Sequence, residues 1–121
     1  MLCVSVNAMA ELMVYEKRTC TTCRKVAELL RSRGVEYDDV QYHVEGISEE
    51  RIRELLAMAG ISAREALRMR EDGAAELADA PEDEIVAAMA ARPELLQRPI
   101  VVRGDRAVLA RPPEKVLELF A

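Results

Sequence analysis

The feature of this chain that most constrains its fold is the C-x-x-C pair formed by Cys20 and Cys23. The pair follows a short apolar run, residues 12–15, and precedes an amphipathic run that begins at Arg24. These patterns predict a strand, a short loop and a helix in that order. A cysteine at a helix start faces unpaired backbone N–H groups and the positive end of the helix dipole, which stabilise a thiolate. A second cysteine three residues later lies on the same helical face, within reach of a disulfide.

The charges around the pair support a reactive thiol. The chain as a whole has a formal net charge of −5, but the charged residues of the segment 17–25 are all basic: Lys17, Arg18, Arg24 and Lys25. Nearby positive charge favours the ionised form of a thiol. We therefore expect the pKa of Cys20 to lie well below its ordinary value.

Two alternatives to a redox pair remain open. A C-x-x-C can be half of a zinc site, which needs two more ligands. Cys3 and His43 are the remaining cysteine and histidine, and neither belongs to a second pair. A buried structural pair is the other alternative, but cationic flanks do not suit an apolar core. We interpret the pair as redox-active and expect no metal.

Length and composition bound the class of protein. A chain of 121 residues with 50% hydrophobic and 32% charged residues is expected to form one globular domain rich in helices. It contains no apolar stretch near the roughly 18 residues of a membrane span. Three cysteines do not make a disulfide framework and suit a reducing compartment, so we expect a cytoplasmic protein. The acidic balance argues against nucleic-acid binding.

The order of predicted elements defines the domain. Residues 1–10 are expected to form an N-terminal extension, with Met9 as a second candidate start, and residues 11–121 a single domain. A strand over 11–16, a helix over 21–33 ended by Gly34, and a parallel strand over 35–44 make a βαβ half. A helix capped by Ser48 and ended by Gly60 follows.

The second half of the chain predicts a hairpin and a closing helix. Residues 62–80 have helical propensity broken at 72–73, and a further helix starts at Pro81. Strands over 100–102 and 107–109 precede a last helix from residues 112–113. The chain is therefore predicted to be α/β, a four-stranded mixed sheet flanked by helices, with a helical insertion between the βαβ and ββα halves. This is the thioredoxin-like fold. Pro99 stands where such folds place a cis-proline beside the reactive cysteine, and a trans-proline that opens a strand is the alternative.

Three segments together resemble the arsenate reductase (ArsC) family, which includes the Spx-type regulators. They are V-Y-E-K-R-T-C-T-T-C-R-K, G-I-S-A-R-E-A-L-R and R-P-I-V-V…L-A-R-P-P-E, in the order and spacing of the family. The resemblance extends from about Glu11 to Phe120.

The resemblance implies an enzyme and its site. Cys20 matches the nucleophilic cysteine of the reductases, and Arg64, Arg98 and Arg111 match the arginines that hold the arsenic oxyanion. The implied substrate is arsenate, attacked by the thiolate. The best-known members commonly lack a cysteine at position 23, and here Cys23 is expected to resolve Cys20 by forming a disulfide.

The resemblance also bears on cofactors and partners. It implies no bound cofactor, with thioredoxin or glutathione and glutaredoxin as the thiol reductant. Glu16 occupies a place where the reductases often carry a histidine. The alternative is an Spx-type redox-sensing regulator that binds RNA polymerase, in which a C-x-x-C pair acts as the switch. Those regulators lack the R-P-x-E segment that begins at Arg111, which favours the enzyme.

Overall fold

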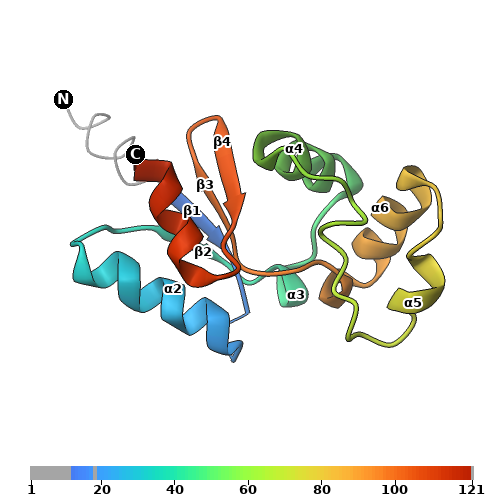
Figure 1. Ribbon diagram of the computed structural model, residues 1–121, viewed down its shortest axis with the longest axis horizontal. Coiled ribbons are helices and arrows are strands. Elements are labelled where there is room, and N and C mark those ends of the chain that lie inside the picture. The colour runs from blue at the N-terminus through green and yellow to red at the C-terminus, as the bar shows by residue number, and fades with distance from the viewer. Residues whose placement is uncertain (1–11, 18, 121) are drawn as a thin grey trace.

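The computed structural model describes residues 12–17 and 19–120, and within them four strands form one sheet of order β2-β1-β3-β4 (Figure 1). β1 (Leu12–Tyr15) runs parallel to β2 (Asp38–Val40) and antiparallel to β3 (Ile100–Arg103). β3 and β4 (Arg106–Leu109) form an antiparallel hairpin. The predicted α/β class and mixed four-stranded sheet are confirmed. The expected extension over residues 1–10 lies outside the described residues.

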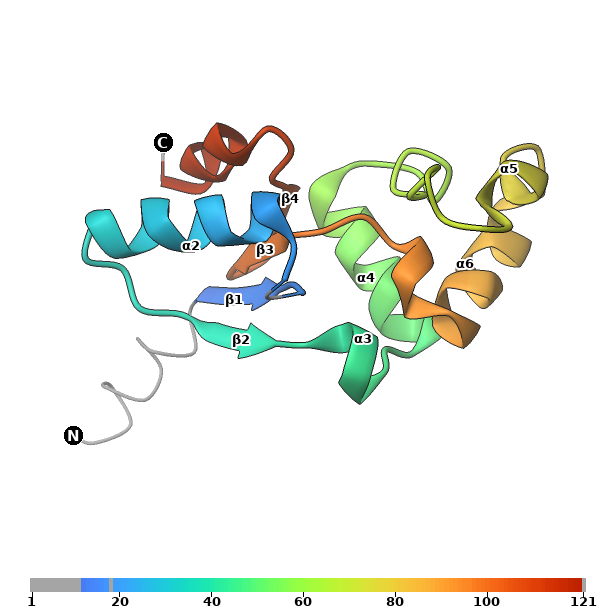
Figure 2. The same ribbon diagram turned by 90° about the horizontal axis from the view of Figure 1, so that it is seen from below.

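Helices cover both faces of the sheet. α2 (Thr21–Ser32) and the 3-10 helix η2 (Pro113–Phe120) lie side by side on one face (Figure 2). Leu12 and Val14 of β1 point into the apolar cluster beneath them, while Tyr15 points into a second cluster formed with α4 (Glu49–Ala59) and α6 (Glu82–Ala91). This alternation follows from the two-residue period of a strand. Each face of β1 therefore joins a separate part of the core.

The predicted ends of two helices agree with the structure to within a residue. Ser48 precedes α4, and its hydroxyl accepts a hydrogen bond of 3.0 Å from the backbone N–H of Arg51. Gly60, with φ of +69°, ends the same helix in the left-handed conformation that favours glycine. The helix predicted over 21–33 is α2. No helix in the described part of the chain is long and apolar enough to cross a membrane.

The prediction of one strand over residues 35–44 was wrong. β2 is three residues long, and residues 42–45 form a short helix, α3 (Tyr42–Glu45). A continuous strand would place Tyr42 and Val44 on one face of the sheet. Instead Tyr42 is fully buried and Val44 is 76% exposed, because a helical turn directs them to different sides. His43, expected on the strand or at its exit, lies half-buried in α3.

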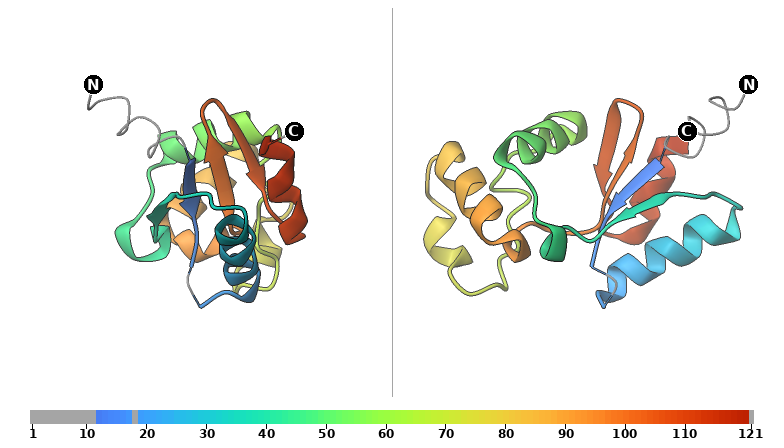
Figure 3. Two further views of the ribbon diagram at one scale, coloured as in Figure 1. Left: turned by 90° about the vertical axis from the view of Figure 1, so that its left-hand side faces the viewer. Right: turned by 180° about the vertical axis from the view of Figure 1, so that it is seen from behind.

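The insertion between the two halves packs as a separate group of helices beside the sheet (Figure 3). Residues 62–80 are mostly turns and contain only the short helix α5 (Ala74–Leu77), so their helical propensity is overridden. The cause is a pairing distant in sequence: Leu67 forms an isolated antiparallel bridge with Leu96. The Arg68 N–H donates to the Leu95 carbonyl at 2.7 Å, and the Gln97 N–H donates to the Ala66 carbonyl at 2.8 Å.

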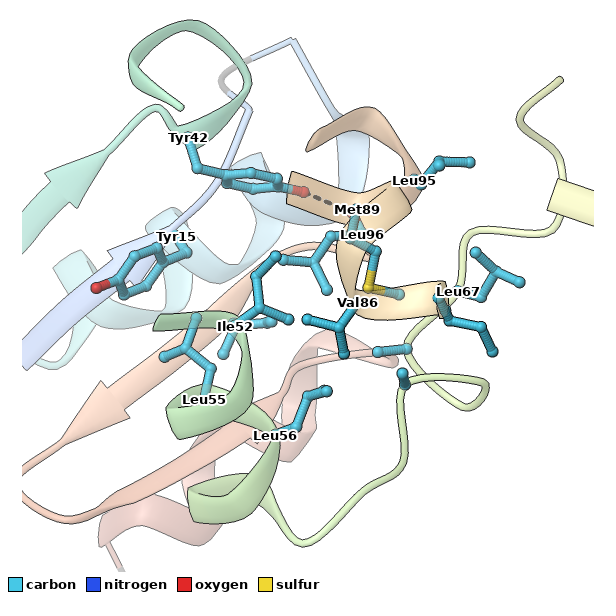
Figure 4. Close-up of a cluster of buried hydrophobic side chains, with 14 of the residues drawn as sticks. Tyr15, Tyr42, Ile52, Leu55, Leu56, Leu67, Val86, Met89, Leu95 and Leu96 are labelled. Carbon is cyan, nitrogen blue, oxygen red and sulfur yellow. Dashed lines mark hydrogen bonds between the residues drawn. The ribbon is translucent and has the colours of Figure 1, made fainter. Parts of the chain in front are cut away.

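A buried apolar cluster unites the insertion with the sheet (Figure 4). Tyr42 lies in this cluster. Its hydroxyl donates a hydrogen bond to the backbone carbonyl of Leu96, the residue that pairs with Leu67. The 3-10 helix η1 (Pro93–Leu95) precedes that point. The chain then passes through Arg98 and Pro99 into β3. α3, the segment around Leu67 and the entry to β3 are thus held together by one side-chain hydrogen bond and by backbone hydrogen bonds.

The last part of the chain follows the predicted ββα order. The turn between β3 and β4 contains Gly104, with φ of +62°. The closing helix begins where the prolines predict it, but it is a 3-10 helix. Val116 and Leu119 are buried as expected, whereas Phe120 is only half-buried.

Candidate functional site at the start of α2

Cys20 and Cys23 lie at the start of α2, as the sequence predicts. Cys20 is the N-cap residue, with extended backbone, and its carbonyl accepts the N–H of Arg24 at 3.0 Å. Its thiol is partly exposed, while Cys23 is fully buried one turn later. Both are free thiols. The pair therefore presents one accessible sulfur and one that is shielded from solvent.

The pKa of the Cys20 thiol is lowered to about 7. Burial alone would raise it, but the backbone N–H groups of Cys23 and Thr22, the Cys23 thiol and the Arg98 guanidinium all stabilise the thiolate. The direction agrees with the sequence-based expectation. The helix start contributes as expected, and Arg98 adds to it from a distant segment.

The pKa of the Cys23 thiol is shifted in the opposite direction, upward. Burial is the largest cause and raises the pKa of its thiol to about 12, and the negative charges of Cys20 and Glu16 act in the same direction. Cys23 therefore stays protonated at neutral pH, and its thiol lowers the pKa of Cys20. The two sulfurs differ at rest: one is a nucleophile and the other a protonated thiol.

A hollow of about 310 Å³ opens above Cys20 and is strongly cationic. Its charged lining residues are Lys17, Arg68, Arg70, Arg98 and Arg111. Three threonines at positions 19, 21 and 22 complete the wall with Cys20, and among the described residues no carboxylate lines it. An anion that enters this hollow meets hydrogen-bond donors and positive charge, with the thiol at the floor.

Arg98 and Arg68 are the two buried cations of the hollow, 4% and 8% exposed. Each guanidinium has an Nε that is buried and makes no hydrogen bond within the described part of the chain. Arg68 lies 3.5 Å from the Glu71 carboxylate and donates weakly to Gln97 at 3.4 Å. Arg98 donates to the Glu94 carbonyl at 3.5 Å. Buried guanidinium groups with such long bonds retain donor capacity for an anion.

Arg111 and Pro99 complete the site on the hairpin side. Arg111 follows β4, and its Nη1 donates to the Arg98 carbonyl at 2.9 Å. The peptide bond between Arg98 and Pro99 is cis, as is the bond between Arg111 and Pro112. Pro99 is buried, and its carbonyl accepts the N–H of Ala110 at 3.0 Å. Both arginines are thus held where β3 begins and β4 ends.

Arg64, which the resemblance places at the oxyanion, lies elsewhere. It is exposed and lines a separate hollow with Ser62, Asp79 and Glu82. The arginine that the G-I-S-A-R-E-A-L-R segment brings to the site is Arg68, because the bridge between Leu67 and Leu96 fixes this end of the segment. Arg68 belongs to the same segment, and its position after the buried Ala66 and Leu67 is the signal that marks it.

Tyr42 is a residue of the site that the sequence did not reveal. Its hydroxyl donates to the Leu96 carbonyl, and Tyr42 and Cys20 both act on the pKa of Arg98, which they raise. Burial raises the pKa of Tyr42, an effect that the charge of Arg98 opposes in part. The phenol therefore remains neutral and orients the guanidinium that faces the thiolate.

The described residues contain no group of three or more His, Cys, Asp or Glu side chains arranged to hold a metal ion. The chemistry that this site displays rests on a thiolate, a second thiol and a cluster of guanidinium groups.

Comparisons with known proteins agree with this geometry. A profile of the ArsC family matches residues 15–119. The chain is 38% identical to the uncharacterized protein YfgD of Escherichia coli (strain K12), covering 90% of this chain and 96% of that one. It is 32% identical to an arsenate reductase of Escherichia coli, covering 93% and 82%. The solved structure of an arsenate reductase from Vibrio cholerae superposes with a TM-score of 0.84 at 33% identity, covering 93% and 98%. The chain therefore belongs to the ArsC family.

Proposed function

We propose that this protein is a thiol-dependent oxidoreductase that reduces arsenate at Cys20. The observation that carries the proposal is the placement of a thiol with a pKa of about 7 at the floor of a hollow lined by four arginines and a lysine. The kinship with arsenate reductases favours this substrate among tetrahedral anions.

Arsenate suits the shape and charge of the hollow. It is a tetrahedral dianion at neutral pH, and planar guanidinium groups pair with such oxygens through two parallel hydrogen bonds. Arg98 and Arg68 offer buried donors, and Arg111 offers a third guanidinium at the rim. Phosphate has a similar shape, so we expect discrimination to rest on the readiness of arsenic to exchange ligands and accept electrons.

The proposed reaction begins with covalent attachment. The Cys20 thiolate attacks arsenic, a sulfur–arsenic bond forms, and one oxygen leaves as water after protonation. Arg98 stands beside the sulfur and the departing charge, where its guanidinium stabilises both. Arsenic is still in the +5 state in this adduct.

Reduction follows when Cys23 attacks the sulfur of Cys20. A disulfide forms between the two cysteines, the sulfur–arsenic bond breaks, and its electron pair stays on arsenic. Arsenic leaves in the +3 state as arsenite, and two thiols have been oxidised. The placement of both cysteines on one face of the first turn of α2 supports this step.

An external dithiol completes the proposed cycle. Thioredoxin, or glutaredoxin with glutathione, reduces the disulfide by exchange through the accessible sulfur of Cys20. The cycle uses no bound cofactor, because all electrons come from thiols.

The decisive test is arsenate-dependent oxidation of NADPH, coupled either to thioredoxin and its reductase or to glutathione, glutaredoxin and glutathione reductase. Cys20→Ser is the blank, since it preserves size and removes the nucleophile. Turnover that disappears in the blank supports the proposal and identifies the reductant. If neither system supports turnover while the Cys20–Cys23 disulfide still forms on oxidation, the enzyme proposal fails and the Spx-type regulator is favoured.

A further inference from the structure

The described residues that line the oxyanion hollow supply no side-chain base for the resolving step proposed above. Cys23 is fully buried and protonated, so its S–H loses a proton as the sulfur attacks Cys20. The lining side chains are cations, threonines and Cys20, none of which is a base at neutral pH once Cys20 carries an adduct. A protein side chain that assists this proton loss would therefore lie outside the hollow.

Glu16 is the carboxylate in the right place. It follows β1 directly, is 5% exposed, and its backbone N–H donates to the Val40 carbonyl at 3.0 Å, which fixes it between β1 and β2. Its side chain and Ala27 line one hollow of about 330 Å³. Ala27 comes four residues after Cys23, so both lie on the same buried stripe of α2. Glu16 is therefore buried against the helix face that carries the resolving thiol.

The second hollow also joins Glu16 to solvent. The other groups that face it are Arg24 and Arg31 from α2, and Tyr37 and Asp39 from the segment that leads into β2. Arg24 and Arg31 are exposed, so the hollow opens to water. The charge of Glu16 raises the pKa of the Cys23 thiol. A proton that reaches Glu16 has an exit that avoids the oxyanion hollow.

We propose that Glu16 accepts the proton of Cys23 when Cys23 resolves the adduct on Cys20. The inference rests on the proposed resolving role of Cys23. The S–H proton passes to the Glu16 carboxylate, and the sulfur electron pair forms the disulfide with Cys20. The bond from Cys20 to its adduct breaks, and the adduct leaves with that electron pair. Glu16 then releases the proton to water through the second hollow.

Proton acceptance gives a function to the Glu16 carboxylate, which lies in the cationic surroundings of the thiols. A negative charge there opposes thiolate formation and would be a poor partner for the nucleophile. Cys20 is stabilised instead by the helix start and Arg98, and Glu16 lines a different hollow from Cys20 and Arg98. The two hollows thus separate the anion chemistry of the first step from the proton transfer of the second.

The test uses the full chain and the chromogenic disulfide 5,5′-dithiobis(2-nitrobenzoate). Cys3→Ser removes the third thiol of the chain, so that attack by Cys20 releases one nitrothiobenzoate in a phase whose rate depends on reagent concentration. Attack by Cys23 on the mixed disulfide then releases the second in a phase that does not. Stopped-flow absorbance separates the two phases, and their rates are measured as a function of pH.

We expect Glu16→Gln to slow the second phase on the order of 10²-fold at neutral pH, the usual contribution of a general base, and to leave the first phase unchanged. In the unmodified protein the second rate should be nearly independent of pH around neutrality. In the variant it should keep rising with hydroxide concentration. Glu16→Asp should restore part of the rate, and Asp39→Asn, which removes a charge from the same hollow, should not change it.

The outcomes separate this inference from the proposed function. An unchanged second phase in Glu16→Gln, or equal slowing of both phases, overturns the role of Glu16 and leaves arsenate reduction standing. Absence of a second phase in the unmodified protein overturns the resolving role of Cys23 and this inference together. Failure of arsenate turnover with a normal Glu16 effect removes arsenate as substrate and supports the proton transfer.

Discussion

The guanidinium of Arg111 donates a hydrogen bond of 2.9 Å to the backbone carbonyl of Arg98. Arg98 precedes β3 and Arg111 follows β4, so the antiparallel hairpin brings them together. One arginine of the hollow therefore fixes the backbone of another. Their positions are coupled, and a change in either should affect both anion binding and the thiol that Arg98 contacts.

Arg111→Ala is expected to raise the KM for arsenate by roughly tenfold to a hundredfold, the range for loss of a hydrogen bond to a charged group. Arg111→Lys keeps the charge but lacks the second arm of the guanidinium, so it should recover only part of the loss. Arg106→Ala, at the exposed far end of the same hairpin, is the matched control. Equal effects at the two positions, in steady-state assays, would contradict the placement of Arg111.

Arg68 and Arg64 give a sharper contrast, because they lie four residues apart in one segment. Arg68→Ala should lower kcat/KM for arsenate on the order of 10²-fold, since it removes a buried donor from the hollow. Arg64→Ala should change it little, because that side chain is exposed in a different hollow. The reverse result would restore Arg64 to the oxyanion site.

The alkylation rate of Cys20 should follow its lowered pKa. Because the thiolate is the reactive form, the rate with iodoacetamide should rise with pH and reach half its maximum near pH 7. A thiol at the reference value of 9.0 would be only about 1% ionised at that pH. Arg98→Ala and Cys23→Ala each remove a donor to the thiolate and should move the midpoint upward. A midpoint that neither variant shifts would show that these groups do not stabilise the thiolate.

Mild oxidation should yield a monomeric Cys20–Cys23 disulfide, because the two thiols lie three residues apart at the start of α2. Peptide mapping under non-reducing conditions detects this link. Cys23→Ala should instead form mixed disulfides or dimers through Cys20. A free Cys23 after oxidation of the unmodified chain would remove it from the resolving role.

Tyr42→Phe should destabilise the protein by about 1–3 kcal/mol, the cost of leaving a buried carbonyl without its donor. The affected carbonyl belongs to Leu96. The urea-unfolding midpoint measures this effect, and the Cys20 alkylation midpoint tests whether Arg98 also moves. Tyr15→Phe is the comparison, since its hydroxyl only accepts a bond from the half-exposed Arg51. A larger loss of stability in Tyr15→Phe than in Tyr42→Phe would contradict the role of the buried Tyr42 hydroxyl.

The elements with strong local patterns were predictable. α2 and α4 have apolar stripes, and Gly34 and Gly60 end them in left-handed conformations. The hairpin has apolar strands around a glycine turn. Cys20 at the helix start needs only the first turn of α2 for most of its stabilising donors, so the reactive thiol could also be located from sequence.

The errors arose where distant contacts override local preference. Residues 42–45 read as strand, but the hydrogen bond from Tyr42 to Leu96 favours a helical turn. Arg68 was missed, and the resemblance indicated Arg64, because the bridge between Leu67 and Leu96 cannot be inferred from local pattern. The position of Glu16 against α2 likewise depends on the whole sheet.

The pairing of Leu67 with Leu96 has a consequence for specificity. The Cys20 thiolate draws most of its donors from the first turn of its own helix, whereas Arg68 reaches the hollow only while residues 66–68 stay bound to 95–97. A local opening of that pairing would move Arg68 out of the hollow and leave the pKa of the Cys20 thiol low. A partly opened molecule would therefore still react with oxidants and disulfides, although it had lost its selectivity for the anion.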